Sequence, residues 1–106
     1  MIRSLLLVML FSTVAAADSS SPAAIRDDYS NLCNARERSG AGKEKNVNRR
    51  AELIAKYLRT ALKTPEVQAF FRKLGDGSLA PGEIGPALKK AASDAGYKGK
   101  CPMAES

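Results

Sequence analysis

The chain has 106 residues, a formal net charge of +6, two cysteines, no histidine and no tryptophan. The lack of histidine excludes nucleophiles activated by a Ser–His or Cys–His pair, and metal sites built from histidine and cysteine. The length predicts one small domain, and the modest basic excess suits an anionic partner as well as plain solubility.

The start of the chain has the pattern of a secretory signal peptide. A short region with Arg3 precedes the apolar run 5–11, and small residues follow up to position 17. The apolar run is shorter than the roughly 20 residues that span a bilayer. We therefore expect a periplasmic or secreted protein with no transmembrane segment in the mature chain, although a buried N-terminal helix is the alternative. The expected boundaries are a signal peptide at 1–17, a polar leader at 18–21 and a single helical domain at 22–106.

The first helix of that domain is predicted over 22–37. Ser21 suits the N-cap and Pro22 the first turn. One side of the helix is apolar at helical spacing and comprises Ile25, Tyr29, Leu32 and Cys33. The opposite side is polar and comprises Asp27, Asp28, Asn31 and Asn34.

The two cysteines, Cys33 and Cys101, lie near the two ends of the expected domain. In an exported protein an even cysteine count predicts a disulfide, which would tie these ends together. A loop of about 70 residues closed in this way stabilises the fold by about 4 kcal/mol. Two free thiols or an intermolecular bond are the alternatives.

An exposed loop over 39–46 and a second helix follow. The loop has two glycines and no periodicity. It is not a phosphate-binding P-loop, because glutamate follows Lys43 where that motif needs serine or threonine. The helix begins at an Asn46 or Asn48 cap, with a Glu52–Lys56 ion pair expected along it. Its apolar stripe comprises Val47, Ala51, Ile54, Leu58, Ala61 and Leu62, and its charged stripe comprises Arg49, Glu52, Lys56, Arg59 and Lys63.

The third helix begins at Thr64-Pro65-Glu66, a combination of cap, helix-starting proline and first-turn acid. Its apolar face comprises Val67, Phe70, Phe71 and Leu74. We expect Phe70 and Phe71 at the centre of the core, because they bring the most apolar area. Gly75 is expected to end the helix in a left-handed conformation.

The segment after the third helix matches half of a calcium-binding EF-hand loop. Aligned on Gly77, its first two ligand positions are Arg72 and Leu74, neither of which supplies a ligand oxygen. We therefore expect a turn and a helix start near Pro81, with no metal and no cofactor. Gly85-Pro86 indicates that this helix begins irregularly or later.

The fourth helix ends at Gly96, and its apolar positions are Ile84, Leu88, Ala91, Ala92 and Ala95. The tail over 97–103 is too rich in glycine and proline for a helix. No segment shows a convincing strand pattern. The sequence therefore predicts a small all-α, four-helix domain.

Basic residues gather on the second helix and the loop before it, and this face is the best candidate for binding. Such a face can dock an anionic surface, although Glu52 within it favours the alternative of a plain solvated face. Export and the lack of a basic motif interleaved with aromatics argue against nucleic acid. The candidate binding residues are Lys43, Lys45, Arg49, Arg50, Lys56, Arg59 and Lys63.

We therefore expect a non-enzymatic exported protein that binds a protein or an anionic envelope component. The overall plan of size, helicity and one disulfide is similar to the small acid-stress chaperones of the Gram-negative periplasm. That resemblance covers no sequence motif and assigns no residue, and it implies client binding in acid. A small hydrolase that uses a carboxylate pair, for example Glu52 with Glu83, is the third hypothesis.

Overall fold

The structure is a computed structural model that describes residues 20–105, and every regular element in that range is helical. This confirms the all-α prediction with four long helices. The predicted signal peptide at 1–17 lies outside the described residues. Among residues 20–105 no helix has both the length and the apolar character needed to cross a membrane. The elements are α2 (Pro22–Cys33), α3 (Ala35–Arg38), η1 (Ala41–Lys43), α4 (Val47–Ala61), α5 (Pro65–Gly75), α6 (Pro81–Asp94) and η2 (Pro102–Glu105).

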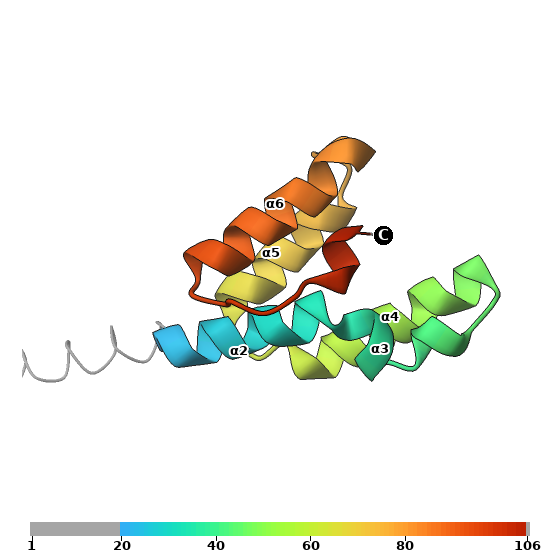
Figure 1. Ribbon diagram of the computed structural model, residues 1–106, viewed down its shortest axis with the longest axis horizontal. Coiled ribbons are helices and arrows are strands. Elements are labelled where there is room, and N and C mark those ends of the chain that lie inside the picture. The colour runs from blue at the N-terminus through green and yellow to red at the C-terminus, as the bar shows by residue number, and fades with distance from the viewer. Residues whose placement is uncertain (1–19, 106) are drawn as a thin grey trace, which may run out of the picture.

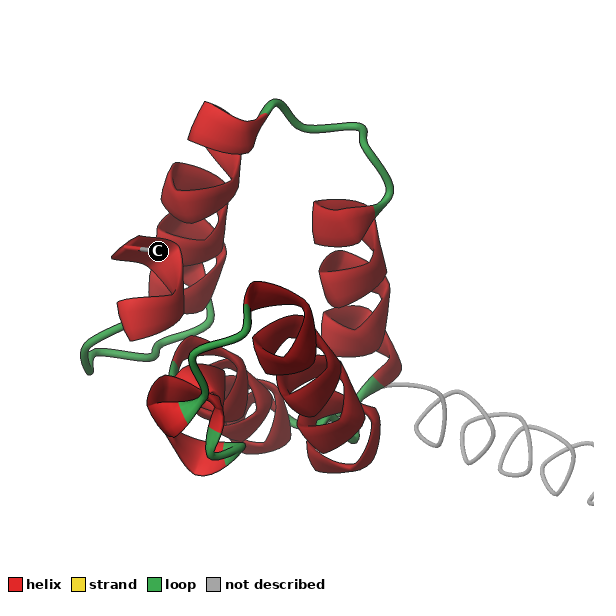
Figure 2. Cartoon of the chain, turned by 90° about the vertical axis from the view of Figure 1, so that its right-hand side faces the viewer, coloured by secondary structure: helices red, strands yellow, loops and turns green. Residues whose placement is uncertain are grey.

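Helix α2 is the centre of the fold. It runs beside α4 in one layer, and α5 and α6 lie across that layer (Figure 1). Figure 2 shows α5 and α6 as two diverging arms that are joined at their far ends by a loop. Contacts connect α2 with α4, α5, α6 and η2, so most of the chain packs around this one helix.

The buried core is built from aliphatic side chains where these helices meet. Leu32, Leu58, Val67 and Leu88 are each at most 2% exposed. The prediction that Phe70 and Phe71 are central was wrong, because both are half-buried at the edge of the cluster. Helix α5 packs on α2 and diverges from α6 (Figure 2), with which it shares few contacts.

The first helix is interrupted at Asn34, which corrects the prediction of one helix over 22–37. Asn34 has φ −107° and ψ 18°, outside the helical range, and separates α2 from α3. Its side-chain amide donates to the Ser30 carbonyl (2.8 Å) and to the Tyr97 hydroxyl (3.1 Å). Asparagine side chains compete with the helix for backbone partners in this way. The break turns the chain toward η1.

Asp28 is buried, although the sequence placed it on the polar side of its helix. One carboxylate oxygen accepts from the Lys63 N–H (2.9 Å), the Thr64 N–H (2.7 Å) and the Thr64 hydroxyl (2.8 Å). Thr64 in turn caps α5 by accepting from the Val67 N–H (3.3 Å). A buried carboxylate is tolerated only when its oxygens are hydrogen-bonded. Asp28 therefore fixes the turn between α4 and α5 onto α2.

The turn between α5 and α6 uses Gly77, with φ +86°, as its left-handed residue. The prediction that Gly75 has this role was wrong, because α5 continues through Gly75 and Asp76 caps it. Helix α6 begins at Pro81, as predicted, and continues through Pro86 without a late start.

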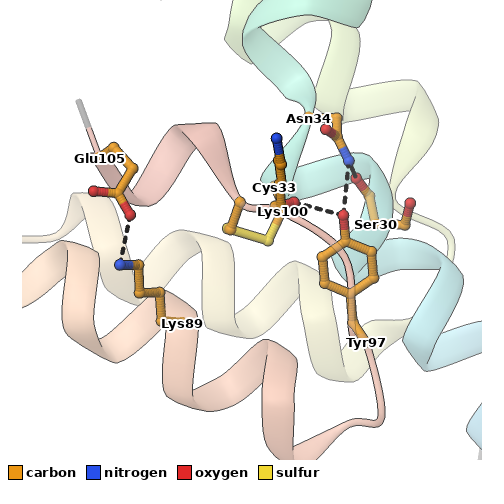
Figure 3. Close-up of a disulfide and its surroundings, with 8 residues drawn as sticks. Ser30, Cys33, Asn34, Lys89, Tyr97, Lys100 and Glu105 are labelled. Carbon is orange, nitrogen blue, oxygen red and sulfur yellow. Dashed lines mark hydrogen bonds and ion pairs between the residues drawn. A yellow bond between two sulfur atoms is a disulfide. The ribbon is translucent and has the colours of Figure 1, made fainter.

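The C-terminal tail is fastened to α2 and α6. The sulfur atoms of Cys33 and Cys101 lie 2.15 Å apart, at disulfide distance (Figure 3). A Cβ at Gly85 would lie 2.3 Å from the Ala104 carbonyl oxygen, so glycine there allows the tail to approach α6. The prediction of a tail without helix was wrong at its end, where η2 forms against α6.

Candidate binding surface

The charge of the protein is divided unevenly between two regions. The basic limb, residues 35–63, contains α3, η1 and α4 with nine lysines and arginines and three glutamates, a formal charge of +6. The neutral body, residues 20–34 and 64–105, contains seven basic and seven acidic residues. The whole net charge of the described chain therefore resides in the limb.

The far end of the basic limb projects away from α5 and α6. In Figure 1 the loop before α4 and the first turn of α4 form the end of the molecule opposite the start of α2. The fully buried side chains of this part are Ala35 and Ala41, whereas Leu58 and Leu62 join the core at the other end of α4. Asn46 caps α4 by accepting from the Arg49 N–H (3.0 Å). The limb is thus anchored at one end and thinly packed at the other.

Most of the predicted binding residues lie on the outside of the limb. Arg49, Lys56 and Arg59 line a shallow hollow of about 430 Å³ on α4, together with Glu52. Lys43 and Lys45 are exposed before α4, and Lys63 is exposed after it.

Arg50 points away from the other predicted binding residues. Its side chain is half-buried and donates to the Glu44 carbonyl (3.2 Å). It lines a separate hollow of about 260 Å³ with Arg36 and Gly42. Arg49, Lys56 and Arg59 therefore share the hollow on α4, whereas Arg50, which the sequence placed beside this stripe, lines a different hollow.

Six exposed cations of the limb form no ion pair with any residue between 20 and 105. Two lysine–carboxylate ion pairs lie in the neutral body. The Lys89 Nζ is 2.5 Å from a Glu105 carboxylate oxygen (Figure 3), and the Lys90 Nζ is 3.0 Å from an Asp94 carboxylate oxygen. The Glu52–Lys56 pair expected from the sequence does not form between these two described residues. These six cations are Lys43, Lys45, Arg49, Lys56, Arg59 and Lys63.

The sequence placed Val47 and Ala51 in the apolar stripe of α4, but both are exposed, and Val47 is the larger of the two. Val47 is 66% exposed. Its spacing does continue the stripe of Leu58, but α3 and η1 are the neighbours of this end of α4, and they leave Val47 uncovered. The helical period predicted correctly which side of α4 Val47 lies on. It could not predict that α3 and η1 leave this part of that side uncovered.

A third hollow, of about 620 Å³, lies in the neutral body beside the disulfide. Its lining includes Ala92, Tyr97, Lys98 and Lys100, with Cys101 at one side. The Tyr97 hydroxyl is already engaged, because it accepts from Asn34 and donates to the Lys100 carbonyl (2.6 Å; Figure 3). The hydrogen bonds of the Tyr97 hydroxyl therefore hold the C-terminal tail against Asn34.

The acidic residues give no sign of a metal site or of a catalytic carboxylate pair in the described chain. Within residues 20–105 no group of three or more potential ligands could hold a metal ion. The Glu83 carboxylate, one half of the hypothetical hydrolase pair, accepts from the Ala80 N–H (2.8 Å) at the start of α6.

No family model, curated protein or solved structure matches the chain.

Proposed function

We propose that the protein is an exported, non-enzymatic binding protein whose basic limb docks onto an anionic surface of another protein or of the cell envelope. The observation that supports this proposal is the segregation of charge, with +6 in the limb and a balanced body. A charge that served only solubility has no reason to gather in one region. A concentrated field of one sign steers and orients an anionic partner.

The unpaired cations favour the same proposal. A cation already engaged in an ion pair must break that pair before it binds a partner. The exposed side chains Arg49, Lys56 and Arg59 have no such pair within the described part of the chain, so they are available to anions at once. Because these charges are exposed, salt screens them over about 8–10 Å, and binding should weaken as salt increases.

The test is binding to immobilised dextran sulfate, a polyanion without an apolar phase. The limb variant Arg49→Glu, Lys56→Glu, Arg59→Glu is compared with a body variant Lys73→Glu, Lys98→Glu, Lys100→Glu. Both variants change the net charge equally at exposed positions. At about 1 kcal/mol per cation removed and a similar term per anion added, the limb variant should lose more than about 100-fold in affinity. Equal losses in the two variants would show that net charge alone decides, and the proposal would be wrong.

A periplasmic stress chaperone is a second candidate, favoured by the carboxylates at the two ends of α5. The pKa of Glu66 is lowered by its own backbone N–H and by the Ser20 hydroxyl, and the pKa of Asp76 is lowered by Ser78. Acid that protonates them would loosen α5 and uncover Phe70 and Phe71. The measurement is suppression of aggregation of an unrelated denatured protein. Suppression confined to acid favours the chaperone, and none at either pH rejects it.

A further inference from the structure

We propose that the basic limb docks end-on to an anionic phospholipid bilayer, with Val47 entering the interface between headgroups and acyl chains. This inference rests on the proposed function and names the partner of the same limb. The limb tip is defined as residues 43–50, which are the turn at the end of η1, the loop and the first turn of α4.

The first argument is the combination of charge and an apolar side chain at the tip. Val47 is the large apolar side chain that is exposed in the described chain, at 66%. Three exposed cations lie within four residues of it, namely Lys43, Lys45 and Arg49. Both features strengthen binding to an anionic bilayer. The cations bind the lipid headgroups, and an apolar side chain that inserts below the headgroups is removed from water. Only the cations strengthen binding to a soluble polyanion, because it has no apolar phase for Val47 to enter.

The one acid of the tip does not oppose this arrangement. Glu44 is half-buried, and its carboxylate accepts from the Asn46 N–H (3.2 Å). It is thereby held against the loop backbone. The tip keeps a formal charge of +3, from three exposed cations, the half-buried Arg50 and one carboxylate.

The second argument is the position of the tip in the molecule. The tip is the end of the limb that lies farthest from α5 and α6 (Figure 1), so a flat surface can reach it without meeting the neutral body. Lys56 lies nine residues along α4 from Val47, about 13 Å at 1.5 Å per residue. That separation exceeds the Debye length of about 8 Å at physiological salt. End-on docking therefore uses the tip cations much more than Lys56, Arg59 and Lys63.

The first experiment uses Val47→Trp. The chain has no tryptophan, so this residue is the only indole emitter, and Ala69→Trp on the exposed side of α5 is its control. The probes are vesicles of phosphatidylglycerol mixed equally with phosphatidylcholine, vesicles of phosphatidylcholine alone, and dextran sulfate. We expect a blue shift for Trp at position 47 with the anionic vesicles only, and no shift for Trp at position 69. An unshifted emission from position 47 on bound vesicles would overturn the insertion.

The second experiment separates end-on docking from docking by the side of α4. The tip variant Lys43→Glu, Lys45→Glu, Arg49→Glu and the side variant Lys56→Glu, Arg59→Glu, Lys63→Glu change the charge equally. In vesicle flotation the tip variant should lose more than about 100-fold in affinity and the side variant less than about 10-fold. Equal losses, or a larger loss in the side variant, would overturn the end-on arrangement.

The probes also distinguish this inference from the function on which it rests. Limb-dependent binding to dextran sulfate without binding to anionic vesicles would leave the proposed function standing and overturn the lipid partner. It would point to an acidic protein or polymer instead. Failure to bind either anion would overturn both proposals. Circular dichroism of every variant checks that the helices have formed.

Discussion

Helices α5 and α6 of the neutral body and helix α4 of the basic limb differ in how they begin. In the body, α5 and α6 each start with a proline, and each has a glutamate in the first turn, Glu66 and Glu83. In the limb, α4 has no acid in its first turn and has Arg49 there instead. The partial positive charge at a helix N-terminus favours acids and disfavours cations by about 0.3–1 kcal/mol each. Helices α5 and α6 follow the rule that stabilises a helix start, and α4 departs from it.

The two regions also differ in how they are held. Within the body, the disulfide and the glycine at position 85 connect segments far apart in the sequence. The far end of the limb has buried alanines and the Asn46 cap. Local departures from stabilising rules are expected at functional sites, with stability supplied elsewhere. Substitutions in the body should therefore change stability, and substitutions in the limb should change binding.

The largest expected effect is loss of the disulfide. The double variant Cys33→Ala, Cys101→Ala should lower the free energy of unfolding by about 4 kcal/mol, because the bond closes a loop with a sequence separation of 68. Urea unfolding of the variant and of the oxidised wild type measures this. Dextran sulfate binding by the folded fraction should be unchanged. A loss of binding that exceeds the loss of folded protein would show that body and limb are not independent.

The next effect is removal of the buried carboxylate that joins the two regions. Asp28→Ala leaves the Lys63 and Thr64 N–H groups without their acceptor, which should cost about 3 kcal/mol. Asp27→Ala, at an exposed position of the same helix, is the matched control and should change stability by less than about 0.5 kcal/mol. Equal effects in urea unfolding would mean that Asp28 does not fix the α4–α5 turn.

A smaller effect is the acid dependence of α5. Glu66 and Asp76 have folded pKa values below their ordinary values of 4.5 and 3.8. Their contribution to stability is therefore complete above those values and is lost as the pH falls through the folded pKa values. Ser78→Ala removes the main cause of the shift at Asp76, so thermal melts of this variant should depend less on pH between neutral and acid conditions. An unchanged pH dependence would contradict the assignment.

The features that depend on local sequence were predicted, and those that depend on distant neighbours were not. Pro22, Pro65 and the Thr64 cap mark helix starts through their own backbone preferences, and the structure confirms them. The burial of Asp28 depends instead on the α4–α5 turn, which lies 35 residues away in the sequence. The need for glycine at position 85 depends on the tail.

The candidate site was predictable to the same extent. Six of the seven proposed binding residues could be assigned to an outer face, because charge and helical period are local. The exposure of Val47 and the inward turn of Arg50 could not be assigned, because both depend on where α3 and η1 end.

The smallest expected effect on stability tests most directly whether the start of α4 differs from the starts of α5 and α6. Arg49→Glu places an acid in the first turn of α4, as in α5 and α6, and should raise the free energy of unfolding by about 0.5 kcal/mol. Lys56→Glu makes the same charge change in the middle of the helix, where the helix dipole has little effect, and should not stabilise. Both positions lie three or four residues from Glu52, so the added repulsion between acids is similar in the two variants.

Urea unfolding and vesicle flotation measured on the same two proteins give the result. Arg49→Glu should be the more stable variant and the weaker binder, because Arg49 belongs to the limb tip. A gain in stability with binding intact would mean that Arg49 has no contact with the anionic surface. Weaker binding without a gain in stability would mean that the arginine does not oppose the helix dipole. Only the combined result supports a helix start in which stability is reduced to keep a cation at the binding end of the limb.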